Sequence, residues 1–247
     1  MRKTKSVVCD KFGGSPVTKL SQNSQNRQLS PPLSAPPTPD DCPHLVSPKQ
    51  KNMEKEKFPR SAAEAVAAEL MVTKYRLGEL CERWAIAGSI RRKKPEVSDI
   101  EIVYVPGKGV RKITDDFFPY SKPVNCMAEG LDVLVEARIL KPRENKDGHK
   151  IAAAGDKNKF VVHVSSGIHV DFFSCPAANW WNYFTCRTGS AASNERISNA
   201  ALARGYHWRT GGPGFEAMRD GGIIPVYSEQ EVFAFVGLPY LPPEKRV

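Results

Sequence analysis

The chain has 247 residues, 40% of them hydrophobic, which is enough for one or two compact domains with apolar cores. It contains no run of eighteen apolar residues and no apolar stretch typical of a secretory signal, so we expect a soluble protein without a membrane partner. The net charge of +9 favours a polyanionic partner, although a solvated basic tail explains this charge equally well. The six cysteines form no CxxC pair, which predicts reduced thiols in a cytoplasmic or nuclear setting.

Residues 1–57 are predicted to be a disordered, basic tail. They hold eight of the 20 prolines, and Phe12 is their one Phe, Tyr or Trp residue. A segment of this composition buries too little apolar surface to offset the entropy lost on ordering. Ten Lys/Arg against five Asp/Glu give the tail a charge of +5, more than half of the total.

The first ordered element is predicted to be a helix that begins near Phe58. Ser61 with Glu64 three residues later forms a capping-box pattern. The following stretch, AAEAVAAELMVTKYRLGELCERW (residues 62–84), places apolar residues among charges at roughly helical spacing. We therefore expect the helix to run through this stretch.

The middle of the chain shows strand patterns. IEIVYV (residues 100–105) is a β-branched run that ends at a Pro-Gly turn. LDVLVEARIL (131–140) fits either a strand or a helix. FVVHV (160–164) and IHVDFF (168–173), joined by Ser-Ser-Gly, predict a β-hairpin.

Helical patterns return in the last third of the chain. AANWWNYFTC (residues 177–186) and SNERISNAALARG (193–205) are predicted to be helices, with Gly205 as the C-terminal stop of the second. The last forty residues are rich in Gly and Pro.

Three carboxylates stand in strand patterns. Asp99 and Glu101 are two residues apart, so both side chains leave the same face of the strand and repel each other unless a cation lies between them. Asp171 interrupts the apolar run HVDFF, where an uncompensated charge is costly. If the two strands are neighbours, the three carboxylates converge and can hold two Mg²⁺ ions for in-line phosphoryl displacement.

Other interpretations of these residues stay open. A D-x-E at the start of a strand is common on solvated strand edges, and alone it favours catalysis weakly. His163, His169 and Cys175 also lie close in sequence and could ligate a metal, although isolated His and Cys on strands are more often packing or surface residues.

The segment upstream of Asp99 strengthens the catalytic interpretation. Gly88 allows a ligand to approach the backbone closely, and Ser89 offers a hydroxyl. The basic run at residues 91–94 offers forked Arg donors for phosphate oxygens. A phosphate-binding turn and a metal-ligand pair therefore lie on one short stretch.

Four motifs together resemble family X (DNA polymerase beta-like) DNA polymerases. GSIRRKKPEVSDIE (residues 88–101) resembles their nucleotidyltransferase signature, G-S-x-R-R followed by D-x-D, and RTGSAASN (187–194) is similar to their Y-F-T-G-S-x-x-x-N segment. HVDFF (169–173) is similar to the strand with the third catalytic Asp, and IPVYSEQEVFAFVGLPYLPPEKR (224–246) to the end of the thumb. The motifs follow the family's order and extend over about residues 60–247.

The resemblance implies an α+β fold in a minimal palm-thumb form. A nucleotidyltransferase palm, a mixed β-sheet backed by helices, would span residues 58–176, and a small α/β thumb would span 177–247. Only about 30 residues separate the predicted tail from Gly88, which leaves no room for the family's amino-terminal lyase domain.

The resemblance also implies the site. Asp99, Glu101 and Asp171 would be catalytic and bind two Mg²⁺ ions, or Mn²⁺, with Asp171 also accepting the primer 3'-hydroxyl proton. Seven residues would bind the nucleotide: Gly88, Ser89, Arg92, Arg187, Gly189, Ser190 and Asn194. The sequence departs from the family where Glu101 replaces the usual second Asp, and where Cys186 and Arg187 replace an aromatic pair beside the sugar.

The function that the resemblance implies is DNA-directed addition of a deoxynucleotide to a primer 3'-hydroxyl, in gap-filling repair. The partners would be primer-template or gapped DNA and nucleoside triphosphates, with the protein acting as a monomer. One alternative is template-independent nucleotidyl transfer to a nucleic acid or another acceptor. Another is a binding protein that has lost catalysis, which the presence of all three carboxylates disfavours.

Overall fold

The computed structural model describes residues 56–113, 120–144 and 158–246. The predicted disordered tail, apart from its last two residues, lies outside this part of the chain. Residues 56–246, where described, fall within one compact unit. Across the described ranges, no helix combines the length and apolarity needed to cross a bilayer.

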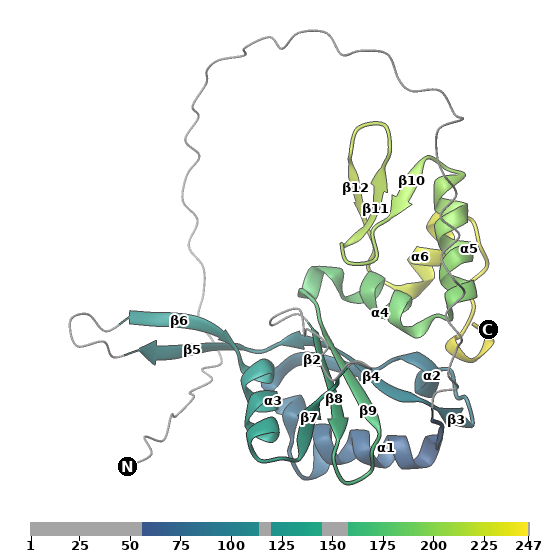
Figure 1. Cartoon of the computed structure of the whole chain (residues 1–247). Helices are drawn as coiled ribbons and strands as arrows, with labels where there is room; N and C mark the ends of the chain where they lie inside the picture. The colour runs from purple at the N-terminus through teal and green to yellow at the C-terminus, as the bar shows by residue number, and fades with distance from the viewer. Residues whose placement is uncertain (1–55, 114–119, 145–157, 247) are drawn as a thin grey trace, which may run out of the picture. The chain divides into compact units, whose positions relative to one another are not determined.

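A five-stranded sheet with strand order β2-β4-β9-β8-β7 forms the centre of this unit (Figure 1). Its strands are β2 (Cys81–Ile86), β4 (Asp99–Pro106), β7 (Leu140–Pro142), β8 (Asn158–His163) and β9 (His169–Ser174). The pair β4 and β9 is parallel, and the other neighbouring strands are antiparallel. The mixed sheet with its helices confirms the predicted α+β fold, and the β8–β9 hairpin confirms the predicted one.

Helices cover one face of this sheet. They are α1 (Arg60–Ala68), which continues as a π-helical turn (Glu69–Thr73), and α3 (Cys126–Glu136). Their buried side chains pack on the alternate residues of the central strands, in a core that includes Ala67, Leu70, Met127, Leu131, Ile100, Ile102, Val170 and Phe172. Removing this apolar surface from water is the main stabilising term of the layer.

The first helix is shorter than predicted. Its N-cap is Pro59, with no side-chain cap hydrogen bond, so the predicted cap at Ser61 is wrong. Phe58 and Pro59 form β1, which pairs with β3 (Glu96–Val97), and this pairing fixes where the helix can begin. The CERWAI stretch forms β2 rather than helix because pairing with β4 overrides its helical spacing.

The stretch 131–140, which fitted either element, contains both. Helix α3 ends at Glu136 and β7 begins at Leu140. Arg138 lies between them with a φ of 59°, so the chain turns through the left-handed region there. A two-stranded ribbon, β5 (Lys108–Ile113) and β6 (Tyr120–Asn125), follows the central strand β4 and was not predicted.

The C-terminal part has a separate core. It contains α4 (Trp180–Thr188), α5 (Ala191–Leu202), α6 (Glu229–Phe235) and a three-stranded sheet of β10 (Tyr206–Trp208), β11 (Gly214–Ala217) and β12 (Ile223–Pro225). Three 3-10 turns complete the described elements: Leu77–Leu80, Ala177–Asn179 and Pro243–Lys245. This core joins α5, the small sheet and α6 through Ile197, Ala201, Trp208, Phe215, Val226, Val232, Phe233 and Val236. The two predicted helices are confirmed, while the predicted boundary at residue 176 stays a prediction.

Helix α4 connects this part to the central sheet. Trp180 and Phe184 pack against Val103, Val105 and Phe173 on the sheet face opposite α1 and α3. The segments before and after residue 176 are therefore held together by buried apolar contacts as well as by the chain. Four cysteines within the described residues are free: Cys81, Cys126, Cys175 and Cys186.

Candidate active site

The register of β4 and β9 places the three predicted carboxylates on one face of the sheet. Glu101 lies opposite Asp171, and Asp99 lies opposite His169, two residues earlier on each strand. Because side chains alternate, these carboxylates point away from the core that holds their neighbours Ile100 and Phe172. The condition set by the sequence, that the two strands be neighbours, is met.

Gly88 makes room for the Glu101 carboxylate. It has a φ of +60°, and a Cβ atom built on it would lie 1.9 Å from Glu101 Oε2. Any side chain at this position would therefore be strained in its backbone and would displace the carboxylate. The amide of the preceding residue, Ala87, donates to the Glu101 carbonyl at 2.8 Å, so the Gly-Ser turn is fixed against β4.

The carboxylates repel one another. Burial, with the charges of Asp99 and Asp171 as smaller contributions, raises the pKa of Glu101 to about 7, against the opposing charges of Arg187 and Arg92. A carboxyl that is both desolvated and surrounded by negative charge favours neutralisation, either by a proton or by a cation. The electrostatics of the cluster therefore fit a bound cation.

The donor atoms also suit a hard metal ion such as Mg²⁺, which prefers carboxylate oxygens. In the described part of the chain, however, no three His, Cys, Asp or Glu side chains are already gathered as a metal-binding group. The alternative set of His163, His169 and Cys175, which lies within the described residues, likewise does not form such a group. The carboxylates thus share a face and a chemistry that fit a divalent cation, and they require side-chain adjustment to ligate one.

The raised pKa of Glu101 gives a pH prediction. Between pH 4.5, its ordinary pKa, and about 7, the folded chain keeps a proton that the unfolded chain has released. The contribution of this group to the free energy of unfolding therefore decreases as pH rises through that window, by up to about 3 kcal/mol. Urea unfolding of the metal-free chain at pH 5 and pH 8 measures this decrease, and Glu101→Gln should remove it. A Glu96→Gln control, at an exposed position, should keep the wild-type dependence; an equal dependence in Glu101→Gln would contradict the assignment.

The predicted phosphate-binding turn forms a short helix, α2 (Gly88–Arg91). The hydroxyl of Ser89 is shielded from solvent and has no hydrogen-bond partner among the described residues. Arg92 Nη1 donates to the carbonyl oxygens of Thr188 and Gly189 at 2.7 and 3.2 Å. Arg92 thus joins the two predicted nucleotide-binding segments, which are almost one hundred residues apart in the chain.

The second nucleotide-binding segment is organised around the start of α5. Ser190 is the N-cap of this helix and accepts a hydrogen bond from the Ser193 amide at 3.1 Å. Asn194 donates to the Cys186 carbonyl at 2.9 Å, and a Cβ on Gly189 would lie 2.5 Å from Asn194 Oδ1. Both the Gly and the Asn therefore have a structural reason to be there, independent of a ligand.

Arg187 lies against the aromatic residues of the sheet and α4. Its guanidinium is 3.7 Å from the ring centroid of Phe173 and donates to the Tyr183 hydroxyl at 3.3 Å. Its charge also lowers the pKa of Glu101, as described above. Arg187, which was predicted to bind the nucleotide, therefore lies beside the carboxylate cluster.

A buried ion cluster near the turn was not predicted from sequence. Glu229, at the start of α6, accepts two hydrogen bonds from Arg91 at 2.6 and 2.8 Å and one from Arg246 at 2.8 Å. Burial raises the pKa of Glu229, but the bonds from Arg91 and Arg246 outweigh burial and hold that pKa below its usual range. Arg91 also donates to Thr188 Oγ1 at 2.6 Å. The cluster therefore connects Arg91 of α2, Thr188 of α4, Glu229 of α6 and Arg246 near the C-terminus.

A second residue that sequence reasoning missed is Arg143. Its Nη1 lies 2.9 Å from Asp171 Oδ1, so one of the three carboxylates is already paired with a cation of the chain. No motif marks this arginine, which follows β7 in a stretch of mixed charges.

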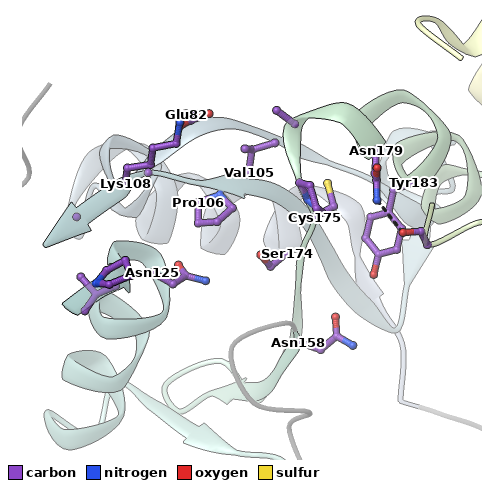
Figure 2. A pocket seen from close by; sticks show the side chains of 17 residues that line it. Glu82, Val105, Pro106, Lys108, Asn125, Asn158, Ser174, Cys175, Asn179 and Tyr183 are labelled. Atoms are coloured by element: carbon purple, nitrogen blue, oxygen red, sulfur yellow. Dashed lines mark hydrogen bonds and ion pairs between the residues drawn. The ribbon is translucent and has the colours of Figure 1, made fainter. Parts of the chain in front are cut away.

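A cavity of about 900 Å³ opens at the other end of β4 and β9 (Figure 2). Val105, Pro106 and Cys175 line it together with Asn179 and Tyr183 of the segment that follows β9. None of the predicted site residues belongs to its lining. The candidate site is therefore defined by its charges and the Gly-Ser turn, and this cavity is a separate feature.

Comparisons with known proteins agree with this architecture. Residues 183–247 match the model of the DNA polymerase beta thumb family. The fold is similar to that of polymerase beta from Leishmania infantum, solved as a ternary P/T complex, with a TM-score of 0.57 and 20% sequence identity over 78% of this chain and 77% of that one. No curated protein matches the chain. The chain therefore has the polymerase beta fold, with a thumb-family segment at its C-terminal end.

Proposed function

We propose that this chain, which is family X polymerase-like in its fold and its thumb segment, is a nucleotidyltransferase that adds a deoxynucleotide to a primer 3'-hydroxyl under the direction of a DNA template. The observation that carries the proposal is the placement of Asp99, Glu101 and Asp171 on one sheet face, with the Gly-Ser turn packed against Glu101. Gap-filling repair is the cellular role that we propose for this activity.

Two divalent cations, Mg²⁺ or Mn²⁺, would be held by Asp99, Glu101 and Asp171. When bound, such ions neutralise developing charge on the transferred phosphoryl group and orient the reacting oxygens. The chain itself contributes the oxygens of Asp171, which face Glu101 and can accept the proton of the primer 3'-hydroxyl.

The nucleotide would be bound by the turn and the adjoining segment. Ser89 offers a shielded hydroxyl with no partner in the described residues, which a phosphate oxygen can satisfy. Arg92 and Arg187 carry charge beside the carboxylates. Arg91, in contrast, is engaged by Glu229 and Thr188, so we assign it to holding the turn in place rather than to the nucleotide.

DNA is the proposed partner, with the chain acting as a monomer in the cytoplasm or nucleus. The similar polymerase was solved as a ternary P/T complex, which we take as primer and template, and a net charge of +9 suits a polyanion. The thumb-family segment supports the same partner.

Primer extension tests this proposal. The full chain with Mg²⁺ or Mn²⁺ and deoxynucleoside triphosphates should extend a primer on gapped DNA and leave a single-stranded primer unextended. Equal extension of both substrates would indicate template-independent transfer, and extension of neither under any metal would indicate a binding protein without catalysis. Glu101→Gln in the same assay separates the chain's own activity from a contaminant.

A further inference from the structure

Arg143 is held at the carboxylate cluster by three separate contacts, one of its backbone and two of its side chain. Its Nη1 lies 2.9 Å from Asp171 Oδ1, its backbone amide donates to the Phe160 carbonyl at 2.9 Å, and its guanidinium lies 4.9 Å from the centroid of the Phe160 ring. Phe160 is the residue of β8 that lies opposite Asp171 in the sheet. Backbone, ring and carboxylate thus place the guanidinium at Asp171 together.

This pair is largely removed from solvent. The Arg143 side chain is 19% exposed and the Asp171 side chain 11% exposed. At such burial an ion pair is screened much less than at the surface. Arg143 therefore places a positive charge of the protein beside one carboxylate of the cluster, that of Asp171.

A divalent cation that binds Asp171 would lie close to the Arg143 guanidinium. Two positive charges at one carboxylate repel each other, and the Arg143 guanidinium does not lose its proton to relieve the repulsion. The ion must therefore displace the guanidinium from Asp171 or share the carboxylate with it, and either change weakens net binding of the ion.

We propose that Arg143 is an internal counter-ion of Asp171 that competes with divalent cations and so sets the metal affinity of the cluster. The proposal rests on the proposed function in one respect, namely that Asp171 is a metal ligand. It adds a positioning residue, one that acts on the metal site through Asp171 without contacting substrate.

Direct binding of Mn²⁺ to the full chain, without DNA or nucleotide, tests the proposal. The electron paramagnetic resonance signal of free Mn²⁺ reports the bound fraction for wild type, Arg143→Ala and Arg143→Lys. Arg143→Ala should bind Mn²⁺ about tenfold more tightly than wild type, since about 1.4 kcal/mol of competition corresponds to tenfold in affinity. Arg143→Lys retains the charge and should stay near wild type.

Lys141→Ala is the matched control. It removes one positive charge from an exposed position of β7, two residues before Arg143, so its Mn²⁺ affinity should equal that of wild type. Thermal unfolding of each variant confirms that it is folded, and Arg143→Gln replaces the alanine variant if that one does not fold. Mn²⁺ affinity that is unchanged or weaker in the variant without the Arg143 charge would overturn the proposal.

The variant Asp171→Asn separates a failure of the counter-ion role from a failure of the proposed metal site. If Asp171→Asn weakens Mn²⁺ binding but Arg143→Ala does not strengthen it, the metal site stands and the counter-ion role is wrong. If Asp171→Asn leaves Mn²⁺ binding unchanged, the metal site itself is misplaced, and the counter-ion role is wrong with it.

Discussion

Asp171→Ala should abolish nucleotide addition, with a loss of at least about a thousandfold in kcat, because it removes a metal ligand and the proposed proton acceptor together. The variant should remain folded. It leaves Arg143 without its carboxylate, which is destabilising, but it also relieves the repulsion on Glu101, and these effects oppose each other. Single-turnover incorporation on gapped DNA, with circular dichroism of the same sample, measures both quantities.

Asp132→Ala is the control for this variant. Asp132 is an exposed carboxylate of α3 that pairs with Lys159 at 2.6 Å, so the same chemical change is made to an ion pair outside the cluster. Its rate should equal that of wild type, since exposed pairs contribute little. Extension by Asp171→Ala at near the wild-type rate would show that the assigned carboxylate is not part of the reaction.

Glu229→Ala should lower the free energy of unfolding by about 3–5 kcal/mol, because it leaves one fully buried and one partly buried cation without their shared carboxylate. Arg246 is fully buried, and its Nη1 lies 2.8 Å from Glu229 Oε1, while Arg91 binds Glu229 through its two terminal nitrogens, Nη1 and Nη2. Urea unfolding followed by fluorescence measures the loss. The cluster also holds the turn that carries Ser89 and Arg92, so the KM for the nucleotide should rise in conditions where the variant is folded.

Glu244→Ala provides the comparison. Glu244 is 44% exposed in its side chain and lies 3.9 Å from Lys93, so its removal should change the unfolding free energy by less than about 0.5 kcal/mol. A Glu229 variant as stable as this control would mean that the buried cluster contributes no net stability.

The sequence predicted the site where local patterns were sufficient. Asp99 and Glu101 share a face because of strand alternation, and the turn between residues 164 and 168 places Asp171 on a hairpin strand. The adjacency of β4 and β9 could only be stated as a condition, and the structure meets it. The roles of these residues stay predictions until the variants above are measured.

The failures have physical causes of two kinds. The pairing of β1 with β3 makes helix α1 begin at Arg60, so Ser61 lies inside the helix and is not its cap. In the stretch that forms β2, pairing with β4 overrode a local helical pattern. Arg143 and Glu229 could not be recognised because their partners are remote in sequence; Arg91 and Glu229 are 138 residues apart. Contacts of this kind are created by the tertiary fold and leave no periodic signal in the chain.

The identity of the incorporated nucleotide shows whether addition follows a template. The full chain with Mg²⁺ is mixed with DNA that carries a one-nucleotide gap, in four versions that differ only in the templating base. We expect the added deoxynucleotide to change with the templating base and to follow Watson–Crick pairing in all four versions. Addition of the same nucleotide opposite every base, or no addition to any of the four, would contradict this expectation.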